Sequence, residues 1–148
     1  MIIKNRSEID NKKVLIMTSI GGSPVHIGHC RLILDCKKKV VENSSLREDQ
    51  LHLLVIVNCD DFLIRKHGFV FQSESDRAEI IDSLKSVDST YIHQSDKQTV
   101  DDAIHYFQPH YFCKGGDRSS ISAMPECEIK ACEDYGTVLL FGVGGSEK

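Results

Sequence analysis

The hydrophobic and polar positions of this chain follow two alternating patterns. Short runs of consecutive apolar residues are typical of strands buried on both faces of a parallel sheet, and the clearest run covers residues 51–58. Between the runs, apolar residues recur three or four positions apart, which indicates helices with one buried face. The strands predicted in this way are 14–19, 51–58, 90–93, 111–113 and 138–141.

The helices predicted between these strands are 27 to about 43, 73 or 75 to 87, 100–107 and 126–135. Pro109 and Gly136 are suited to end the last two of them. Residues 62–71 follow neither pattern, and we expect a loop or a short irregular segment there. Strands that alternate with helices are joined by right-handed crossovers. We therefore predict an α/β fold with one domain over residues 1–148, a Rossmann-like open parallel sheet of about five strands with helices on both faces.

Length, charge and cysteine content narrow the class of protein. The 148 residues are enough for one hydrophobic core. The net charge of −4 argues against nucleic acid or an anionic membrane surface as the main partner. Residues 1–13 lack the apolar core of a secretory signal, and no apolar run approaches the roughly 20 residues of a membrane span, so we expect a cytoplasmic protein. The six cysteines have neither Cys-x-x-Cys nor zinc-finger spacing, which favours buried reduced thiols over a metal site.

The most informative stretch is residues 18–31, Thr-Ser-Ile-Gly-Gly-Ser-Pro-Val-His-Ile-Gly-His-Cys-Arg, which links the first predicted strand to the first predicted helix. The first N–H groups of a helix have no partner within the helix, and the helix dipole adds partial positive charge there. Glycines allow the backbone to approach an anion closely. His26 and His29 place two ring nitrogens on the same turn. The pattern predicts a cradle for a polyphosphate, and the plainer alternative is a strand-to-helix turn with two solvated histidines.

The segment His26-Ile27-Gly28-His29 resembles the His-x-Gly-His signature of the nucleotidyltransferase superfamily. This superfamily is also called the cytidylyltransferase-like superfamily. Its members include glycerol-3-phosphate cytidylyltransferase and the adenylyltransferase domain of ADP-heptose synthase. The resemblance runs from about Val14 to the end of the sequence and implies that both histidines are catalytic. It also implies a nucleotide-binding role for the neighbouring residues Ile20, Gly21, Gly22, Ser23 and Gly28.

A basic segment after the second predicted strand supplies the third catalytic candidate. The family usually carries a lysine here that reaches the nucleotide phosphates, and Lys66 fits this position, with Arg65 as the second choice. A solvated basic turn is the alternative. Arg77 and Ile81 match the family's Arg-x-x-x-(Leu/Ile) pattern, which leaves Arg77 either on the acceptor side or in a structural role.

The loop after the fourth predicted strand resembles the Lys-Gly-Gly-Asp of the heptose-phosphate adenylyltransferase branch, and its residues are Lys114, Gly115, Gly116 and Asp117. The resemblance implies that this loop binds the nucleotide. Its glycines let the backbone pass close to a base or ribose. Lys114 supplies a mobile positive charge, and Asp117 either accepts a hydrogen bond from a ligand hydroxyl or anchors its own loop. A plain turn is again the alternative.

The sequence departs from the family pattern in two places. Gly142 and Gly144 fall in a glycine-rich segment that in relatives leads into a phosphate-binding Ser/Thr-rich helix start, but no Ser/Thr run follows them here. We still expect these two glycines to bind the nucleotide. Many relatives also place Phe-Asp before the His-x-Gly-His, where this chain has residues 22–25, Gly-Ser-Pro-Val. Both departures favour an alternative function, a nucleotide-binding module of the same fold without turnover.

The resemblance implies an enzyme that moves an AMP or CMP unit from ATP or CTP to a sugar-phosphate or polyol-phosphate acceptor and releases pyrophosphate. Both substrates are anions, so positioning and charge neutralisation are the main tasks. Mg²⁺ is expected to accompany the nucleotide, bound by triphosphate oxygens and water, with no ligand from the protein. The expected partners are a nucleoside triphosphate and a small phosphorylated acceptor, without nucleic acid or membrane. Relatives commonly dimerise, which leaves a homodimer open, as the base and the acceptor also remain open.

Overall fold

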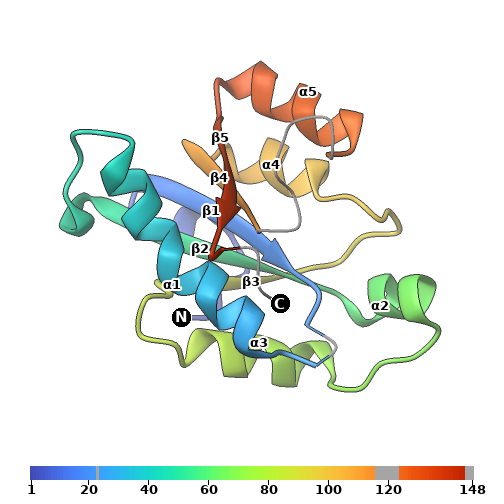
Figure 1. Ribbon diagram of the computed structural model, residues 1–148. Helices are drawn as coiled ribbons and strands as arrows, with labels where there is room; N and C mark the ends of the chain where they lie inside the picture. The colour runs from blue at the N-terminus through green and yellow to red at the C-terminus, as the bar shows by residue number, and fades with distance from the viewer. Residues whose placement is uncertain (23, 116–123, 146–148) are drawn as a thin grey trace.

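A five-stranded parallel sheet forms the centre of the computed structural model, which describes residues 1–22, 24–115 and 124–145 (Figure 1). The strands lie in the order β3-β2-β1-β4-β5, and every neighbouring pair is parallel. Their bounds are Val14–Ile20 for β1, Leu51–Asn58 for β2, Ser89–His93 for β3, Tyr111–Gly115 for β4 and Val138–Val143 for β5. The predicted α/β fold is therefore confirmed, and each strand lies where the apolar runs placed it.

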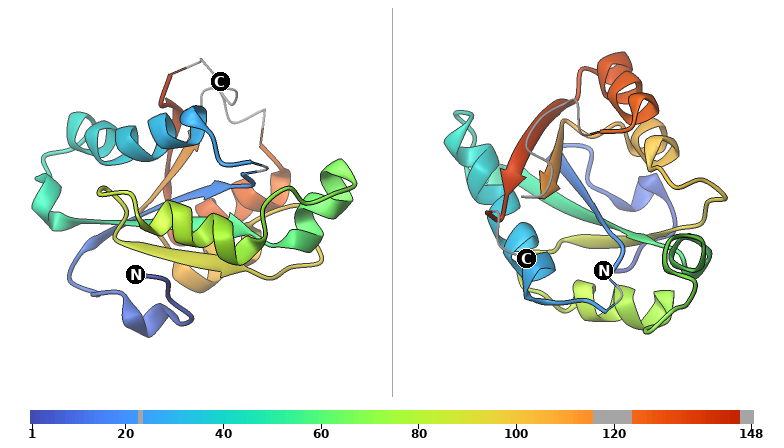
Figure 2. Two further views of the ribbon diagram at one scale, coloured as in Figure 1. Left: turned by 90° about the horizontal axis from the view of Figure 1, so that it is seen from below. Right: turned by 45° about the vertical axis from the view of Figure 1, so that its right-hand side comes forward.

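Helices cover both faces of the sheet. Those described are η1 (Arg6–Glu8), α1 (Ile27–Glu42), η2 (Glu48–Gln50), α2 (Asp60–His67), α3 (Glu74–Asp82), α4 (Asp101–Phe107) and α5 (Glu126–Tyr135). α1 and α3 pack on one face, and α4 and α5 pack on the other (Figure 2). Within β2, Leu53 and Val55 face the first layer while Leu54 and Ile56 face the second, which explains its continuous apolar run. None of the helices in the described ranges has both the length and the apolar character needed to span a membrane.

The prediction of a loop or irregular segment over residues 62–71 is wrong, because α2 occupies the first part of it. Two aspartates stand in the first turn of α2 and three basic residues in its last turn. These charges complement the helix dipole and stabilise a helix that is too short to bury much apolar surface. Gly68 then ends the helix in the left-handed conformation, with a φ of 85°.

α3 is shorter than predicted, since it ends at Asp82 and not at residue 87. It begins as expected after Ser73, whose hydroxyl accepts a first-turn N–H. The chain leaves the helix because Asp88 is tied to β2. The Asp88 N–H donates to the Leu53 carbonyl over 3.0 Å, and its carboxylate accepts the Leu53 N–H over 2.8 Å. These bonds start the turn into β3.

Candidate functional site

A cavity of about 230 Å³ lies at the carboxyl ends of β1, β2 and β4. In the sheet, β2 lies on one side of β1 and β4 lies on the other, so the strand order reverses between β1 and β4. Open α/β sheets bind ligands at this switch point. The polar side chains that line the cavity come from seven separate segments: Ser19, His29, Asn58, Lys66, Gln98, Lys114 and Glu128. Pockets that bury a whole drug-sized ligand measure about 300–1,000 Å³, so the cavity formed by the described residues is somewhat smaller than that range.

At the start of α1, the ring nitrogens of His26 and His29 accept hydrogen bonds from backbone N–H groups of the same turn. The Gly28 N–H donates to His26 Nδ1 over 3.0 Å, and the His26 N–H donates to His29 Nδ1 over 3.1 Å. Their rings lie in contact, with centroids 4.0 Å apart and the ring planes tilted by 39°. Because both Nδ1 atoms accept, a neutral imidazole at either position carries its proton on Nε2. Within the described ranges neither Nε2 has a hydrogen-bond partner, so two N–H donors remain at the N-terminus of the helix.

The environment of His29 keeps its ring neutral. Burial, and secondly the charge of neighbouring His26, lower the pKa of His29 from 6.5 to about 4. A neutral His29 retains the unprotonated Nδ1 that accepts the His26 N–H. At neutral pH this side chain is therefore a hydrogen-bond donor through Nε2 and not a cation.

We expect an NMR titration of the free protein to give His29 an apparent pKa near 4. Since the unfolded chain binds this proton near pH 6.5, the contribution of His29 to the free energy of unfolding is complete above pH 6.5. It is lost as the pH falls towards 4. The difference in unfolding free energy between wild type and His29→Gln should shrink over the same interval. A His29 pKa of 6.5 or above would contradict this description of the site.

Of the two basic candidates on α2, the structure brings only Lys66 to the cavity. Lys66 is exposed, and its ammonium lies 6.0 Å from the centroid of the Phe62 ring. The Arg65 guanidinium instead donates to the Gln98 side chain over 2.6 Å and to two carbonyls of residues 95–97. Arg65 therefore fastens α2 to the loop between β3 and α4.

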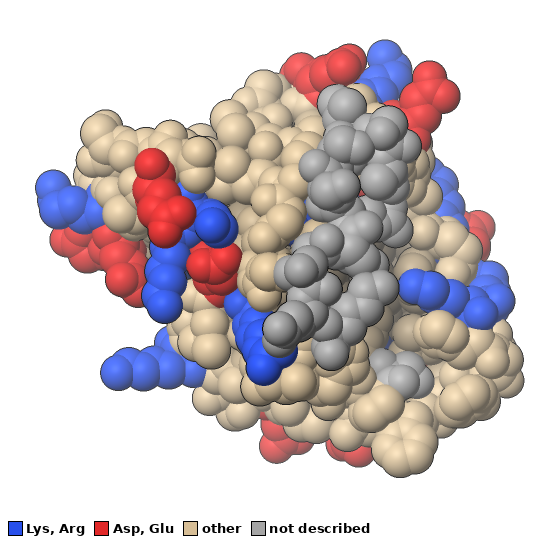
Figure 3. All heavy atoms as spheres, in the orientation of Figure 1, with Lys and Arg blue, Asp and Glu red and all other residues tan. Residues whose placement is uncertain are grey.

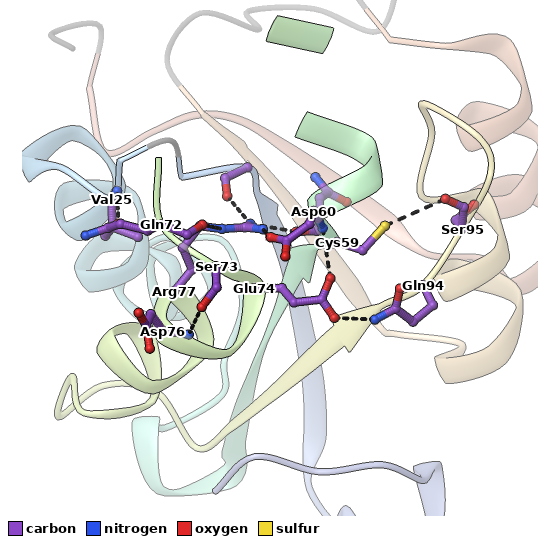
Figure 4. A network of polar contacts seen from close by, with 12 residues as sticks. Val25, Cys59, Asp60, Gln72, Ser73, Glu74, Asp76, Arg77, Gln94 and Ser95 are labelled. Carbon is purple, nitrogen blue, oxygen red and sulfur yellow. Dashed lines mark hydrogen bonds and ion pairs between the residues drawn. The ribbon is translucent and has the colours of Figure 1, made fainter. Parts of the chain in front are cut away.

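Arg77 is fully buried and joins three segments near the cavity (Figure 4). Its guanidinium donates to the carbonyls of Gly21 over 2.7 Å, Asn58 over 2.6 Å and Gln72 over 2.9 Å. It also pairs with the Asp60 carboxylate over 2.9 Å. Arg77 does not line the cavity, and the contacts it makes are structural. It fixes the loop after β1 against the end of β2 and the start of α2.

Lys114 reaches the cavity from β4, paired with a residue that sequence analysis did not single out. Its ammonium lies 3.1 Å from Glu128 Oε1 on α5, and both side chains are buried. The other oxygen of Glu128 accepts the Val100 N–H over 3.1 Å. A signal for Glu128 was present, because it stands on the same stripe of the predicted helix as buried Ala131 and Cys132. A carboxylate on an apolar stripe needs a partner.

Gly142 and Gly144, the two nucleotide-binding candidates near the C-terminus, do not line the cavity. Gly144 packs against α1, and its N–H donates to the Asp35 carboxylate over 2.9 Å. Of the remaining nucleotide-binding candidates, Ile20, Gly21 and Gly115 line the cavity, whereas Gly22 and Gly28 flank it in the β1–α1 segment. Ser23, Gly116 and Asp117 lie outside the described residues.

We expect Gly144→Ala to destabilise the fold by roughly 1–3 kcal/mol. Gly144 has a φ of 84°, and an added Cβ would lie 2.6 Å from the Leu32 backbone nitrogen. Gly145→Ala is a matched control, because Gly145 has a similar φ of 81° with nothing within 4 Å of the added atom. Urea denaturation should show the larger loss for Gly144→Ala. Equal losses would mean that the close approach to α1 costs nothing.

The described residues offer no metal centre of their own. No group of three or more His, Cys, Asp or Glu side chains among them could hold a metal ion. All six cysteines are free thiols, and Cys36, Cys59, Cys113 and Cys132 are buried.

Basic and acidic side chains are mixed over the described part of the face in Figure 3, most clearly over α1. Among the ion pairs of the described residues, Lys37 lies 2.8 Å from Asp88. Such a mixed surface produces no strong field of one sign. Recognition of an anion at the cavity would therefore depend on the local donors described above.

No protein-family model matches this sequence, and no curated protein matches it. Several solved structures share the fold, among them the following two. A lipopolysaccharide core biosynthesis protein from Thermoplasma volcanium has a TM-score of 0.62 and 22% identity, over 88% of this chain and 95% of its own. A macrolide-efflux protein from Streptococcus pneumoniae has a TM-score of 0.57 and 14% identity, over 95% of this chain but only 48% of its own. At these identities the likeness supports the α/β fold alone.

Proposed function

We propose that this protein is a nucleotidyltransferase of the His-x-Gly-His kind, which transfers an AMP or CMP unit from ATP or CTP to a sugar phosphate or polyol phosphate. One observation carries the proposal: His26 and His29 present two Nε2–H donors at the N-terminus of α1. His29 lines the cavity at the switch point of the sheet, and His26 is exposed, outside the cavity lining, with its ring next to that of His29. The dipole of a helix N-terminus favours phosphate, although at α1 the Gly28, His29 and Cys30 N–H groups already donate to His26. The shared fold with a lipopolysaccharide core biosynthesis protein is compatible with a biosynthetic transferase.

In the proposed reaction an oxygen of the acceptor phosphate attacks the α-phosphorus of the nucleotide. A new P–O bond forms, the bond from the α-phosphorus to the bridging oxygen breaks, and pyrophosphate leaves. No covalent intermediate with the protein is needed, because the attacking phosphate is already anionic. Positioning and charge stabilisation then provide most of the catalysis.

The side chains divide this work. His26 and His29 donate to the α- and β-phosphate oxygens as charge develops on them, assisted by the dipole of α1. Lys66, at the mouth of the cavity, balances the charge of the pyrophosphate or the acceptor phosphate. Lys114 extends the positive side of the site, with its charge partly offset by Glu128. Mg²⁺ neutralises triphosphate charge when it is bound with the nucleotide.

The test is a panel of nucleoside triphosphates against phosphomonoesters, with pyrophosphate release as the readout. We expect release with ATP or CTP only when a sugar or polyol phosphate is also present. Because the buried Glu128 partly offsets the charge of Lys114, less positive charge remains to stabilise a reacting phosphate. This pairing favours a second candidate, a nucleotide-binding module without turnover. Tight nucleotide binding without pyrophosphate release across the panel would support that candidate and overturn the transferase.

A further inference from the structure

Asn58, the last residue of β2, is a polar residue of the cavity whose side chain has no hydrogen-bond partner among the described residues. It is only 6% exposed and lines the cavity. Its backbone carbonyl is held by Arg77, but within the described ranges its carboxamide makes no hydrogen bond. The Asn58 amide atoms are not among the fully buried unpaired side-chain atoms of the described residues, so the carboxamide opens onto the cavity and is available to a ligand or to water.

The neighbouring strand repeats this feature. Asn58 is in register with His93 of β3, and paired residues of parallel strands point to the same face of a sheet. The Nε2 of His93 is buried and has no hydrogen-bond partner among the residues that the structure describes. The face is the one covered by α4 and α5, where Lys114 and Glu128 also lie. Polar side chains therefore gather above the ends of three strands on one face, away from the histidine pair at α1.

We infer that Asn58 is a specificity-determining residue that binds a hydroxyl group of the acceptor, an inference that rests on the proposed function. A carboxamide has both donors and an acceptor, as a hydroxyl group requires, whereas an ionised phosphate only accepts. The donors suited to phosphate are already present at α1 and Lys66. Because Asn58 is neutral and held by its backbone, it contributes selection and orientation, not charge.

The consequence is selection against acceptors without hydroxyl groups. A buried site that binds a substrate hydroxyl strongly rejects the analogue that lacks it, because its polar groups then remain unpaired. The inferred acceptor is thus a polyhydroxylated phosphomonoester. A phosphoamine or a plain alkyl phosphate would leave the Asn58 carboxamide unsatisfied.

The first experiment follows the side-chain amide signal of Asn58 by NMR in the wild-type protein. The probes are glycerol 3-phosphate, a hexose 1-phosphate, n-propyl phosphate and inorganic phosphate. We expect at least one hydroxylated probe to move this signal and to bind at least tenfold more tightly than n-propyl phosphate. The inference is overturned if the hydroxylated probes leave the signal in place or bind no better than n-propyl phosphate.

The second experiment uses Asn58→Leu, with Asn11→Leu as a control for the same change in the turn before β1. We expect Asn58→Leu to weaken the hydroxylated probe on the order of tenfold or more, with the affinities for ATP and CTP changed less than twofold. An unchanged probe affinity would overturn the inference. Pyrophosphate release without any movement of the Asn58 signal would remove this inference and leave the transferase intact. Movement of the signal without pyrophosphate release would keep Asn58 as a residue that binds a hydroxyl group and would remove the transferase.

Discussion

His29→Ala is expected to lower the rate of pyrophosphate release by about 10²-fold or more. The substitution removes one preorganised donor to the charge that develops on the phosphates, and such donors contribute about that much to turnover. The effect should fall on turnover more than on the KM for the nucleotide, because the donor acts mainly in the transition state. Steady-state kinetics with saturating nucleotide and acceptor measure it.

Two further variants separate the catalytic role of His29 from its role in capping α1. His29→Asn places an amide oxygen near the position of Nδ1, where it can still accept the His26 N–H, but it has no donor at the position of Nε2. His29→Gln extends a donor towards that position. We expect His29→Asn to release pyrophosphate as slowly as His29→Ala. His29→Gln should recover part of the rate, and the exposed control His105→Ala should match wild type. Full activity in His29→Asn would assign His29 to capping alone.

Arg77→Met should lower the free energy of unfolding by about 3 kcal/mol or more, a large share of the 5–15 kcal/mol typical of a domain. Methionine roughly fills the space but removes the donors to the carbonyls of Gly21 and Asn58 and leaves Asp60 without its partner. Because Asp60 is about one-third exposed, water offsets part of the loss, which places the estimate at the lower end of the range for broken buried pairs. Urea denaturation measures the change.

The matched control is Arg47→Ala. The Arg47 guanidinium pairs with Asp49 over 3.1 Å, but both side chains are 72% exposed. Exposed pairs of this kind contribute about 0–1 kcal/mol, so the control should be nearly as stable as wild type. If Arg77→Met were no less stable than Arg47→Ala, the network around Arg77 would not hold the loops together.

The elements that local sequence determines were the ones most fully predicted. β2 is readable because both of its faces are buried, and α1 begins where the His-x-Gly-His pattern places a helix start. α2 was missed although its signals were present, since acidic residues open it, basic residues close it, and Gly68 follows. Attention to apolar periodicity alone hides a helix that is stabilised mainly by its termini.

The parts of the site that depend on distant residues could not be predicted. Arg77 and Gly21 lie 56 positions apart in the sequence, and no local pattern indicates that an arginine opening a helix will be fully buried. The partner of Lys114 is 14 positions away on another element. The availability of the Asn58 carboxamide is likewise a property of the folded arrangement. The sequence pointed to several of the segments that line the cavity, and the fold determines which side chains reach it.

The shared guanidinium of Arg77 has a dynamic consequence. The loop after β1, the end of β2 and the start of α2 bond to the same planar group, so a displacement of one segment breaks bonds that also restrain the others. We expect these segments to open and close together as one cooperative unit. Amide hydrogen exchange would then register a common opening rate for backbone positions that are far apart along the chain.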